Sequence, residues 1–363
     1  MTEQPGQQLP AGFTILAVET SCDETAAAVI RDGREILANT VASQIALHER
    51  YGGVVPEVAS RQHILTIAPV VEQTLAKLPG GWADVHAVAA TYGPGLSGAL
   101  LTGINTAKAL AWGRGLPFVG VNHLEGHIYA SWLRAGTPGQ PDEPPQFPLV
   151  ALIVSGGHTA LVLLRGHGDY RLLGQTRDDA VGEAFDKVAR IMGLGYPGGP
   201  LMERIARDAR PSSLRLPRAW LRDSYDMSFS GLKTAVLNLV QERMERREGA
   251  EKLAAIEPQY AAQLAAAFQD SVVDVLVKKT IAAAREHKAR EIILAGGVAA
   301  NTALREALTA AAAPAPVRYP PIWLCTDNAA MIGAAAYFRY QAGLQRGWAL
   351  DAVPSLRLAP APA

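Results

Sequence analysis

A repeated order of strands and turns constrains the fold of this chain more than any other feature of its 363 residues. The first half opens with strand-like runs separated by polar turns, in the order Phe13–Glu19, Thr20–Glu24, Thr25–Ile30, Asp32-Gly33 and Glu35–Val41. The second half repeats this order in Phe147–Val154, Ser155–His158, Thr159–Leu164, a Gly-rich turn and Tyr170–Thr176. The residues in register are Phe13, Ser21 and Thr25 with Phe147, Ser155 and Thr159. We therefore expect three consecutive antiparallel strands in each half.

Each group of three strands precedes helical sequence and then a strand that ends in glycines. These later strands are Val85–Ala90 and Glu291–Ala295. A β-β-β-α-β-α unit used twice predicts a duplicated α/β architecture of two lobes, because chance seldom repeats order, turn position and following strand together. The cleft between two such lobes is the usual place for a ligand.

The predicted lobes cover residues 13–135 and 147–345. Between them, Gly136–Pro148 is rich in Pro, Gly and acidic residues, which is typical of an exposed linker. The second lobe is longer because residues 178–260 are inserted before an Ala-rich helix, Ala261–His287. This insertion should form a helical lid or subdomain.

The composition predicts a globular chain in a reducing compartment. The 49% hydrophobic content fits a soluble protein with a sizeable core, and the zero formal charge means that any nucleic acid must bind to a local basic patch. Cys22 and Cys325 are too few for a disulfide framework. We find no signal peptide and no membrane-spanning run, so the cytosol is the expected location. Residues 1–12 and 351–363 should be flexible tails.

Two histidines four residues apart, His123 and His127, lie in a segment that is typical of a helix start. At this spacing both imidazoles project from one helix face and could share Zn²⁺ or Fe²⁺ with a third ligand. The metalloprotease motif H-E-x-x-H differs, because Glu125 stands one place later. One residue is a rotation of about 100° around a helix, so Glu125 points away from the histidines and cannot be the base of a protease. A pair of hydrogen-bonded core histidines is the alternative.

Asp327 is a candidate for the third ligand. It follows the apolar Ile322–Leu324 and precedes an Ala-rich helix. A helix N-cap is the usual task of Asp at such a junction, but two His and one Asp would also leave coordination positions open for a substrate. Both interpretations stay open.

The turns after the first strand of each half carry further candidates. Glycines in Ser155–Thr159 let backbone N–H groups approach an oxyanion or phosphate, although an ordinary hairpin explains them too. Asp23 and Glu24 occupy the equivalent turn of the first half, where a carboxylate could bind metal-bound water or orient a nucleophile. An Asx-type turn explains Asp23 equally well.

Two other Gly-rich segments could hold a nucleotide. Gly296–Asn301 ends a strand and opens a helix, where Asn301 could bind ribose or base or simply cap the helix. Gly193–Pro200 follows a helix that carries Asp186, a candidate for a ribose diol if it is not part of a solvated helix face.

A stretch rich in arginine lies inside the insertion. It contains Arg204, Arg207, Arg210, Arg215, Arg218 and Arg222, with Trp220 among them. Arginine suits phosphate forks, and an aromatic neighbour can stack on a base. This stretch is the first choice for an RNA-contacting surface, and a solvated helical surface is the alternative.

Seven motifs in this order resemble the bacterial TsaD family, the tRNA threonylcarbamoyladenosine transferases once labelled O-sialoglycoprotein endopeptidases. They are His-Leu-Glu-Gly-His, Val-Ser-Gly-Gly-His-Thr, Ala-Phe-Asp-Lys, Tyr-Pro-Gly-Gly, Ser-Phe-Ser-Gly-Leu-Lys, Gly-Gly-Val-Ala-Ala-Asn and Thr-Asp-Asn-Ala-Ala-Met. The similarity runs from about Ile15 to Gln345. It implies a duplicated actin-like ATPase (ASKHA, RNase H-like) fold with a central cleft, which agrees with the repeat.

The resemblance also implies roles for individual residues. His123, His127 and Asp327 would bind one divalent transition metal, Fe²⁺ or Zn²⁺. The residues that would hold threonylcarbamoyl-AMP are Ile153, Val154, Ser155, Gly156, Gly157, Asp186, Gly199 and Asn301. The N6 amine of adenosine 37, 3′ to the anticodon of tRNAs that read codons starting with A, would attack the carbamoyl carbon, and AMP would leave. Candidates for the proton acceptor are His158, Asp23 and Glu24.

The family resemblance implies a TsaB-like paralogue and a TsaE-like ATPase as partners besides tRNA, and we expect neither a membrane nor DNA. An actin-like small-molecule kinase or ATPase is one alternative function, and it would need no histidine pair. A non-catalytic scaffold of the TsaB kind is another, and it should lack the metal triad and the nucleotide glycines.

Overall fold

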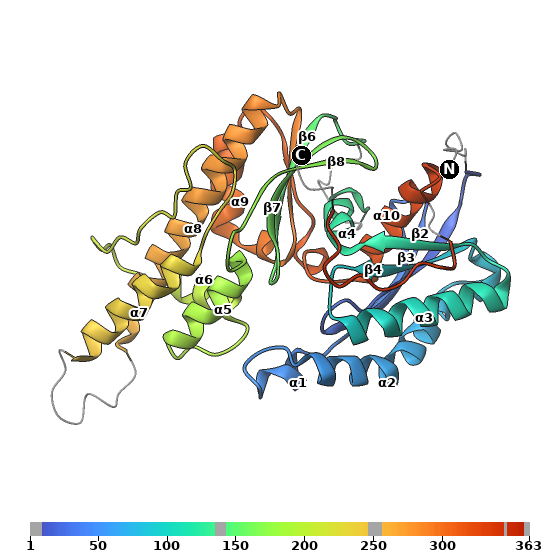
Figure 1. Cartoon of the computed structure of the whole chain (residues 1–363), viewed down its shortest axis with the longest axis horizontal. Coiled ribbons are helices and arrows are strands. Elements are labelled where there is room, and N and C mark those ends of the chain that lie inside the picture. The colour runs from blue at the N-terminus through green and yellow to red at the C-terminus, as the bar shows by residue number, and fades with distance from the viewer. Residues whose placement is uncertain (1–8, 135–142, 246–255, 345–346, 359–363) are drawn as a thin grey trace. The chain divides into compact units, whose positions relative to one another are not determined.

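The computed structural model describes residues 9–134, 143–245, 256–344 and 347–358 (Figure 1). The strands are β1 (Thr14–Glu19), β2 (Glu24–Arg31), β3 (Glu35–Ser43), β4 (Ala87–Gly93), β5 (Phe118–Asn122), β6 (Leu149–Val154), β7 (Thr159–Gly166), β8 (Asp169–Gln175), β9 (Glu291–Ala295) and β10 (Val317–Arg318). The α-helices are α1 (Ile45–Glu49), α2 (Pro56–Leu75), α3 (Ser97–Arg114), α4 (His123–Tyr129), α5 (Val181–Ile191), α6 (Gly198–Arg207), α7 (Ser230–Glu245), α8 (Pro258–Glu286), α9 (Thr302–Ala312) and α10 (Ala329–Gln341).

The strands form two five-stranded sheets with the same topology. Their orders are β3-β2-β1-β4-β5 and, written in the matching direction, β8-β7-β6-β9-β10. In the first sheet β1 pairs antiparallel with β2 and parallel with β4, and in the second β6 pairs parallel with β9. The predicted duplication is therefore confirmed. The sequence pattern did not predict the last strand of each sheet, β5 or β10.

The chain divides into two compact units. Unit 1 contains residues 1–147, 164–171 and 318–363, and unit 2 contains residues 148–163 and 172–317. The C-terminal helix α10 thus belongs to unit 1, because it packs on β1 and β2 of the first sheet. The boundaries 13–135 and 147–345, which follow the two repeats, stay a prediction.

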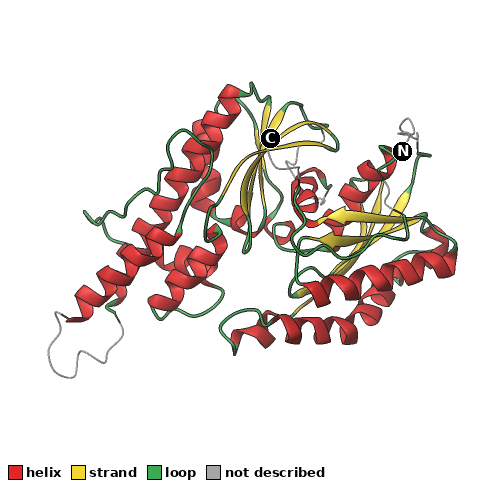
Figure 2. Cartoon of the chain, viewed as in Figure 1, coloured by secondary structure: helices red, strands yellow, loops and turns green. Residues whose placement is uncertain are grey.

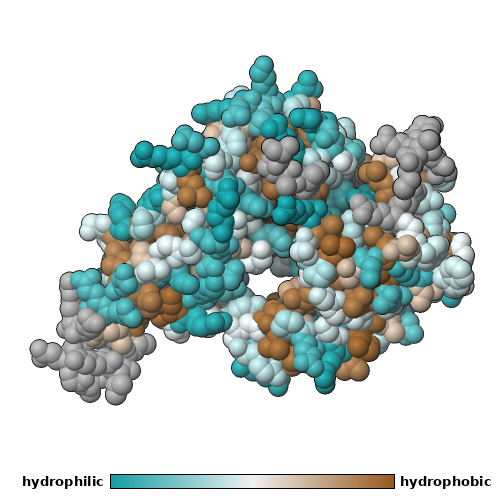
Figure 3. Space-filling model, viewed as in Figure 1, coloured by the Kyte–Doolittle hydropathy of each residue, from teal (hydrophilic) through white to brown (hydrophobic). Residues whose placement is uncertain are grey.

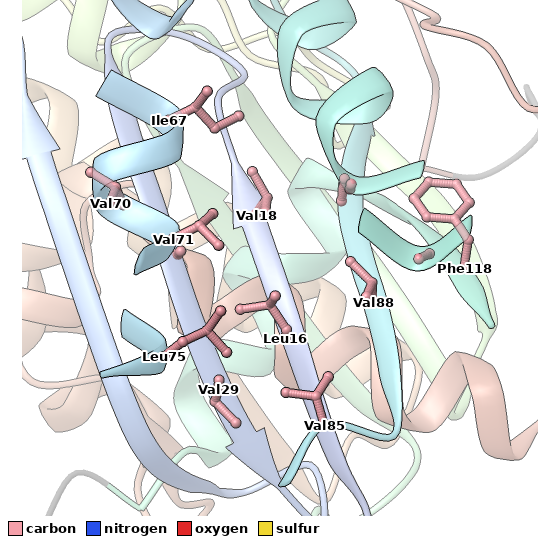
Figure 4. Packing of buried hydrophobic residues seen from close by; sticks show 14 of the residues in the cluster. Leu16, Val18, Val29, Ile67, Val70, Val71, Leu75, Val85, Val88 and Phe118 are labelled. Carbon is pink, nitrogen blue, oxygen red and sulfur yellow. The ribbon is translucent and has the colours of Figure 1, made fainter. Parts of the chain in front are cut away.

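β1 and β4 of the first sheet are buried along their whole length, as expected for a central strand such as β1 with the apolar run Ile15–Val18. Side chains alternate across a strand, and Leu16 and Val18 of β1 pack with residues of α2 and α3 in one core cluster (Figure 4). On the opposite face, Gly333 of α10 packs against the side chains of Ile30 and Ala17. This packing fixes α10 against the sheet, and Asp327 lies just before the start of α10.

The insertion of residues 178–260 is only partly helical. It contains α5, α6 and α7, but residues 208–229 form no helix and no strand longer than a single bridge, Thr176 to Met227 (Figure 2). Pro211 and Pro217 disfavour a helix in this segment, which is instead held by hydrogen bonds to α8, such as the one from Lys279 Nζ to the carbonyl of Leu221, at 2.8 Å. Residues 246–255 lie outside the described residues.

The C-terminal segment is not a loose tail over its described part. The amide of Val353 donates to the carbonyl of Tyr92, and the amide of Gly95 donates to Pro354, at 2.8 and 3.1 Å. The side-chain amide of Asn122 donates to the carbonyl of Arg357. The expectation of a flexible tail from residue 351 is therefore wrong for residues 351–358, since these backbone groups pair with unit 1. Residues 359–363 and 1–8 lie outside the described residues.

Within the described part of the chain, the search for a helix with enough length and apolar character to cross a bilayer found none.

Candidate functional site

The two histidines are positioned by the junction between β5 and α4. β5 ends at Asn122, whose side-chain oxygen accepts a hydrogen bond from the amide of Leu124 at 2.9 Å and so caps α4. His123 is the first residue of the helix and His127 follows one turn later, which places their ring centroids 4.6 Å apart. Both side chains are buried. The predicted shared face of a helix is therefore present.

Asp327 approaches the histidines from the start of α10. Its Oδ1 atom lies 3.5 Å from His123 Nε2 and 3.3 Å from His127 Nε2. The N-cap of α10 is Asn328, whose side-chain oxygen accepts from the amide of Met331 at 3.0 Å. Because Asn328 caps the helix, the Asp327 carboxylate can serve the histidines, and the N-cap alternative for Asp327 is wrong.

The chemistry of these three groups fits a transition-metal ion. One ligand atom from each of His123, His127 and Asp327 lies within 4.8 Å of the other two, which is a spacing that a single ion can bridge. Both ring nitrogens of His127 are buried; Nε2 faces only Asp327 Oδ1, at 3.3 Å, and Nδ1 has no hydrogen-bond partner among the described residues. A buried nitrogen without a partner is costly, and coordination to a metal would remove this cost. Two imidazoles and one carboxylate suit Zn²⁺ or Fe²⁺.

Electrostatics distinguish the two histidines. Burial alone would lower the pKa of His123, but the carboxylates of Asp327 and Glu19 outweigh burial and raise this pKa to about 9. Burial lowers the pKa of His127, and the charge of the neighbouring His123 lowers it further. Without a metal, a proton on His123 therefore offsets part of the charge of the two carboxylates.

Glu19 supports His123 from behind, and sequence reasoning missed it. Its Oε2 atom lies 3.3 Å from His123 Nδ1, and the hydroxyl of Ser21 lies 3.1 Å from the same nitrogen. Glu19 is fully buried and also accepts hydrogen bonds from the Thr91 hydroxyl and the Ser21 amide, each at 2.5 Å. An acidic residue directly after the apolar run Ile15–Val18 was the signal that could have found it. Carboxylate-to-histidine contacts of this kind orient metal ligands.

The carboxylates predicted in the turn of the first half lie in the same unit as the triad. Glu24 is buried, and its Oε1 atom accepts from the Ser43 hydroxyl at 2.8 Å. Burial raises the pKa of Glu24 to about 8, and the charges of Asp23 and Asp327 act in the same direction. Burial also raises the pKa of Asp23, with a further contribution from Asp327. Glu24 is thus a carboxyl group that exchanges its proton close to neutral pH.

In unit 2 the turn between β6 and β7 is closely packed from two sides. The amide of Ser155 donates to the carbonyl of His158 at 2.8 Å, and the His158 amide donates to the Ser155 hydroxyl at 3.2 Å. The amide of Gly182, at the start of α5, donates to the Ser155 carbonyl. Gly296 has φ +92°, and a Cβ there would clash with the backbone of Val154. His158 thus belongs to unit 2, whereas the triad and the other two candidate bases belong to unit 1.

The glycines of this turn have open space above them, as a backbone site for a ligand requires. Gly156 and Gly157 are exposed, and an added Cβ on either would meet no atom within 4 Å. Ile153 and Val154, in contrast, are fully buried in β6. Their side chains support the turn from behind and do not face solvent.

Asp186 lies beside the second Gly-rich segment, as its place in the sequence suggested. Its Oδ1 atom accepts a hydrogen bond from the amide of Gly198, the first residue of α6, at 2.7 Å. Burial raises the pKa of Asp186. The next residue, Gly199, again has open space at its Cβ position.

Asn301 caps a helix. Its side-chain oxygen accepts from the amide of Leu304 at 2.9 Å, and its side-chain nitrogen donates to Gln269 Oε1 at 2.8 Å. Capping was the commoner of the two uses considered, and the structure has it. Both ends of this amide are therefore already engaged within unit 2.

The Arg-rich stretch is partly committed to ion pairs. Arg218 contacts Asp270 and Asp274 of α8 at 2.5 and 3.3 Å, and Arg207 contacts Glu203 at 2.8 Å. Only Arg204 and Arg207 are helical, since α6 ends at Arg207. The alternative of a helical surface is thus wrong beyond that residue.

Comparison with solved structures establishes the fold class. HypF from T. kodakarensis matches with a TM-score of 0.58 over 93% of this chain and 49% of HypF, at 12% identity. Full-length HypF in its phosphate- and nucleotide-bound form matches with a TM-score of 0.55 over 93% of this chain and 47% of that protein, at 14% identity. Together with the two equivalent sheets, these matches confirm the duplicated actin-like ATPase fold.

Comparison with families and curated proteins gives a closer relationship. The family model TsaD, described as tRNA N6-adenosine threonylcarbamoyltransferase, matches residues 35–334. A tRNA N6-adenosine threonylcarbamoyltransferase from Thermomicrobium roseum is 56% identical over 350 residues, covering 93% of this chain and 94% of the relative. A protein of the same name from Symbiobacterium thermophilum is 54% identical over 346 residues, covering 95% and 96%. The chain therefore belongs to the TsaD family of tRNA N6-adenosine threonylcarbamoyltransferases.

Proposed function

We propose that this chain transfers the threonylcarbamoyl group from threonylcarbamoyl-AMP to the N6 amine of adenosine 37 in tRNAs that read codons starting with A. Two enzymes of that name are 56% and 54% identical to this chain over 93% and 95% of its length, which supports the reaction. The observation that carries the proposal is the group of His123, His127 and Asp327, with both histidines buried, which a kinase or ATPase of the same fold would not need. A scaffold without catalytic activity would not need it either.

The reaction needs charge stabilisation and a proton acceptor. The amine nitrogen forms a bond to the carbamoyl carbon, the bond from that carbon to the phosphate oxygen breaks, and AMP leaves with the electron pair. A Zn²⁺ or Fe²⁺ ion, when bound, supplies a Lewis acid for the charge that develops on carbonyl or phosphate oxygen. The two histidines and Asp327 hold it, and Glu19 keeps His123 oriented.

Glu24 is our first candidate for the proton acceptor, ahead of Asp23 and His158. A general base works best when its pKa lies near the working pH, and burial raises the pKa of Glu24 to about 8. Its second oxygen, Oε2, is buried without a hydrogen-bond partner among the described residues. Glu24 in its ionised form would therefore take a proton from the amine readily.

The nucleotide part of the substrate would lie on the turns of unit 2. The exposed backbone of Gly156 and Gly157 suits phosphate, and the Asp186 carboxylate suits the ribose hydroxyls. Gly199 would leave room for the sugar beside Asp186. Asn301 would keep the start of α9 in place, in line with its observed cap.

The test is a reconstituted transfer reaction. Purified chain receives threonylcarbamoyl-AMP, unmodified tRNA, and TsaB-like and TsaE-like partners, and mass spectrometry measures threonylcarbamoyladenosine in the digested tRNA. We expect product from the wild type and none from the His123→Ala/His127→Ala variant. The His86→Gln variant is the matched control, because His86 contacts Thr14 away from the triad. Absence of product from the wild type with competent partners would refute the transfer reaction and favour a kinase or ATPase.

The partner proposal has its own support on unit 1. Two large apolar residues of α2, Ile64 and Leu65, are 64% and 70% exposed, and Leu101 of α3 is also exposed. The space-filling view shows hydrophobic residues gathered over the part of unit 1 that carries α2 and α3 (Figure 3). Exposed apolar surface of this kind is typical of protein interfaces. We assign it to the TsaB-like paralogue, with the cytosol as the shared location.

This interface is tested by co-purification. An Ile64→Asp/Leu65→Asp variant should no longer bind the TsaB-like protein on a size-exclusion column, while its thermal unfolding stays close to the wild type because both side chains face solvent. Retained binding would place the interface elsewhere.

The Arg-rich stretch is the proposed tRNA surface, and weaker tRNA binding by an Arg210→Ala/Arg215→Ala variant would support it.

A further inference from the structure

The three metal ligands come from two helical elements, so the placement of these elements controls the site. His123 and His127 belong to α4, and Asp327 immediately precedes Asn328, the N-cap of α10. Ligand atoms must lie within a few tenths of an ångström of their ideal positions around an ion such as Zn²⁺. A small rotation of α4 about its own axis would move both imidazoles away from Asp327. The contacts between α4 and α10 therefore decide how well the triad is formed.

Glu125 makes one of these contacts on the side of α4 away from the histidines. It stands two residues from each histidine, which is about 200° around a helix. Its Oε2 atom pairs with Nη1 of Arg339, near the end of α10, at 2.9 Å. Its Oε1 atom accepts a hydrogen bond from the Tyr170 hydroxyl at 2.6 Å. Glu125 is 1% exposed, so this is an interior ion pair.

A second contact lies between the ion pair and the triad. Gly126 packs directly on α10, where a Cβ would lie 2.7 Å from Ile332 Cδ1 and 3.2 Å from Met331 Cγ. The two helices thus touch at three points: the triad, the close approach at Gly126, and the pair of Glu125 with Arg339. Contacts on opposite faces of α4 prevent it from turning, whereas an apolar contact alone would tolerate a small rotation.

The energetics of a buried ion pair support this function over a purely stabilising one. Taking both charges out of water costs about as much as their attraction returns, and apolar residues of similar size are often as stable or more so. Directional hydrogen bonds, however, fix one arrangement. A hydroxyl donor from Tyr170, whose pKa burial raises well above its usual value, adds a third direction.

We propose that Glu125, through Arg339 and Tyr170, is a positioning residue that locks α4 against α10 and thereby sets the affinity of the His123, His127 and Asp327 centre for its metal. The inference rests on the metal centre proposed above. Glu125 itself touches neither metal nor substrate.

The test separates positioning from stability. Co²⁺ is added to metal-stripped full-length protein, and its dissociation constant is measured from the absorption of the bound ion and by competition with a chelator. Denaturant unfolding of the metal-free protein gives stability. The principal variant, Glu125→Leu/Arg339→Met, removes both charges and keeps the apolar volume, so that it folds even if Glu125→Gln alone does not.

We expect the double variant to unfold at the same denaturant concentration as the wild type, yet to bind Co²⁺ about 10- to 100-fold more weakly. Tyr170→Phe should give a smaller loss in the same direction. The matched control, Arg177→Met/Asp226→Leu, removes an ion pair of unit 2 and should leave Co²⁺ affinity unchanged.

Wild-type affinity in the stable double variant would overturn the proposal, since the pair would then be replaceable packing. Failure of the wild type to bind Co²⁺ would refute the metal centre and the positioning inference with it. A wild type that binds Co²⁺ but modifies no tRNA would refute only the transfer reaction, because affinity still tests Glu125.

Discussion

The two sheets have the same strand order, but the turn after the first strand of each is specialised differently. In unit 1 the turn between β1 and β2 carries Asp23 and Glu24 and lies against His123 through Ser21. In unit 2 the turn between β6 and β7 carries Gly156 and Gly157, which are open. One copy of a duplicated fold therefore supplies side chains with charge, and the other supplies bare backbone.

Units 1 and 2 also share a close backbone contact that holds each turn in place. A glycine at the end of the following parallel strand approaches the turn so closely that no side chain fits. In unit 1 a Cβ on Gly95 would lie 2.5 Å from the Ser21 carbonyl oxygen, and in unit 2 a Cβ on Gly296 would lie 2.8 Å from the Val154 carbonyl carbon. The scaffold is conserved between the halves of this chain while the chemistry on it differs.

The largest effect should come from removing a charged side chain of unit 1. Asp327→Ala removes one of three ligands and should lower metal affinity and transfer activity by more than about 100-fold, because two imidazoles alone hold an ion poorly. Metal analysis after gel filtration and the tRNA assay measure this. The same substitution at the surface residue Asp351 is the control. Full metal content in Asp327→Ala would mean that the ligands are other residues.

The close contact of these glycines with the turns is tested by adding a methyl group to each glycine. Gly296→Ala should lower the free energy of unfolding by about 2–4 kcal/mol, since the Cβ clashes and φ is +92°. Gly95→Ala should do much the same in the other copy. Gly297→Ala, where nothing lies within 4 Å, should change little. Denaturant unfolding decides this, and equal stability of all three variants would contradict the common role of the two glycines.

The exposed glycine turn of unit 2 is tested by measuring how well it binds the substrate. Gly157→Ala should leave stability nearly unchanged, because its Cβ meets no atom within 4 Å, and should raise the KM for threonylcarbamoyl-AMP by about tenfold through loss of about 1.4 kcal/mol of contact. A substitution in the equivalent turn of unit 1, Cys22→Ala, should leave this KM as it is. An unchanged KM for Gly157→Ala would move the nucleotide away from this turn.

The last prediction concerns a pH dependence of stability that is confined to unit 1. Burial raises the pKa of folded Glu24 to about 8, above its value of about 4.5 in the unfolded chain. The folded state therefore holds this proton more tightly, and stability falls as the pH rises from about 4.5 to about 8. Glu24→Gln cannot titrate, so it should gain about 1–3 kcal/mol on the wild type between pH 5 and pH 8.5. A pH-independent difference between the two would show that Glu24 is not perturbed.

Much of the fold could be predicted because its signals are local. Strand β9 was predicted as Glu291–Ala295 and has those bounds, and the helix predicted as Ala261–His287 is α8, Pro258–Glu286. Apolar runs and turn residues determine such elements within a window of about ten residues. β10 was missed because it has two residues, and β5 because its five residues run directly into α4 without a turn between them.

The duplication, the spacing of His123 and His127, and the glycines in the turns could all be predicted from the sequence, since short segments carry each of these signals. The folded chain was needed to show that Asp327 faces the histidines while Asn328 caps α10, that Glu19 contacts His123, and that Glu125 pairs with Arg339. The physical reason is that side chains far apart in the chain meet through helix and sheet packing. No local periodicity records that packing.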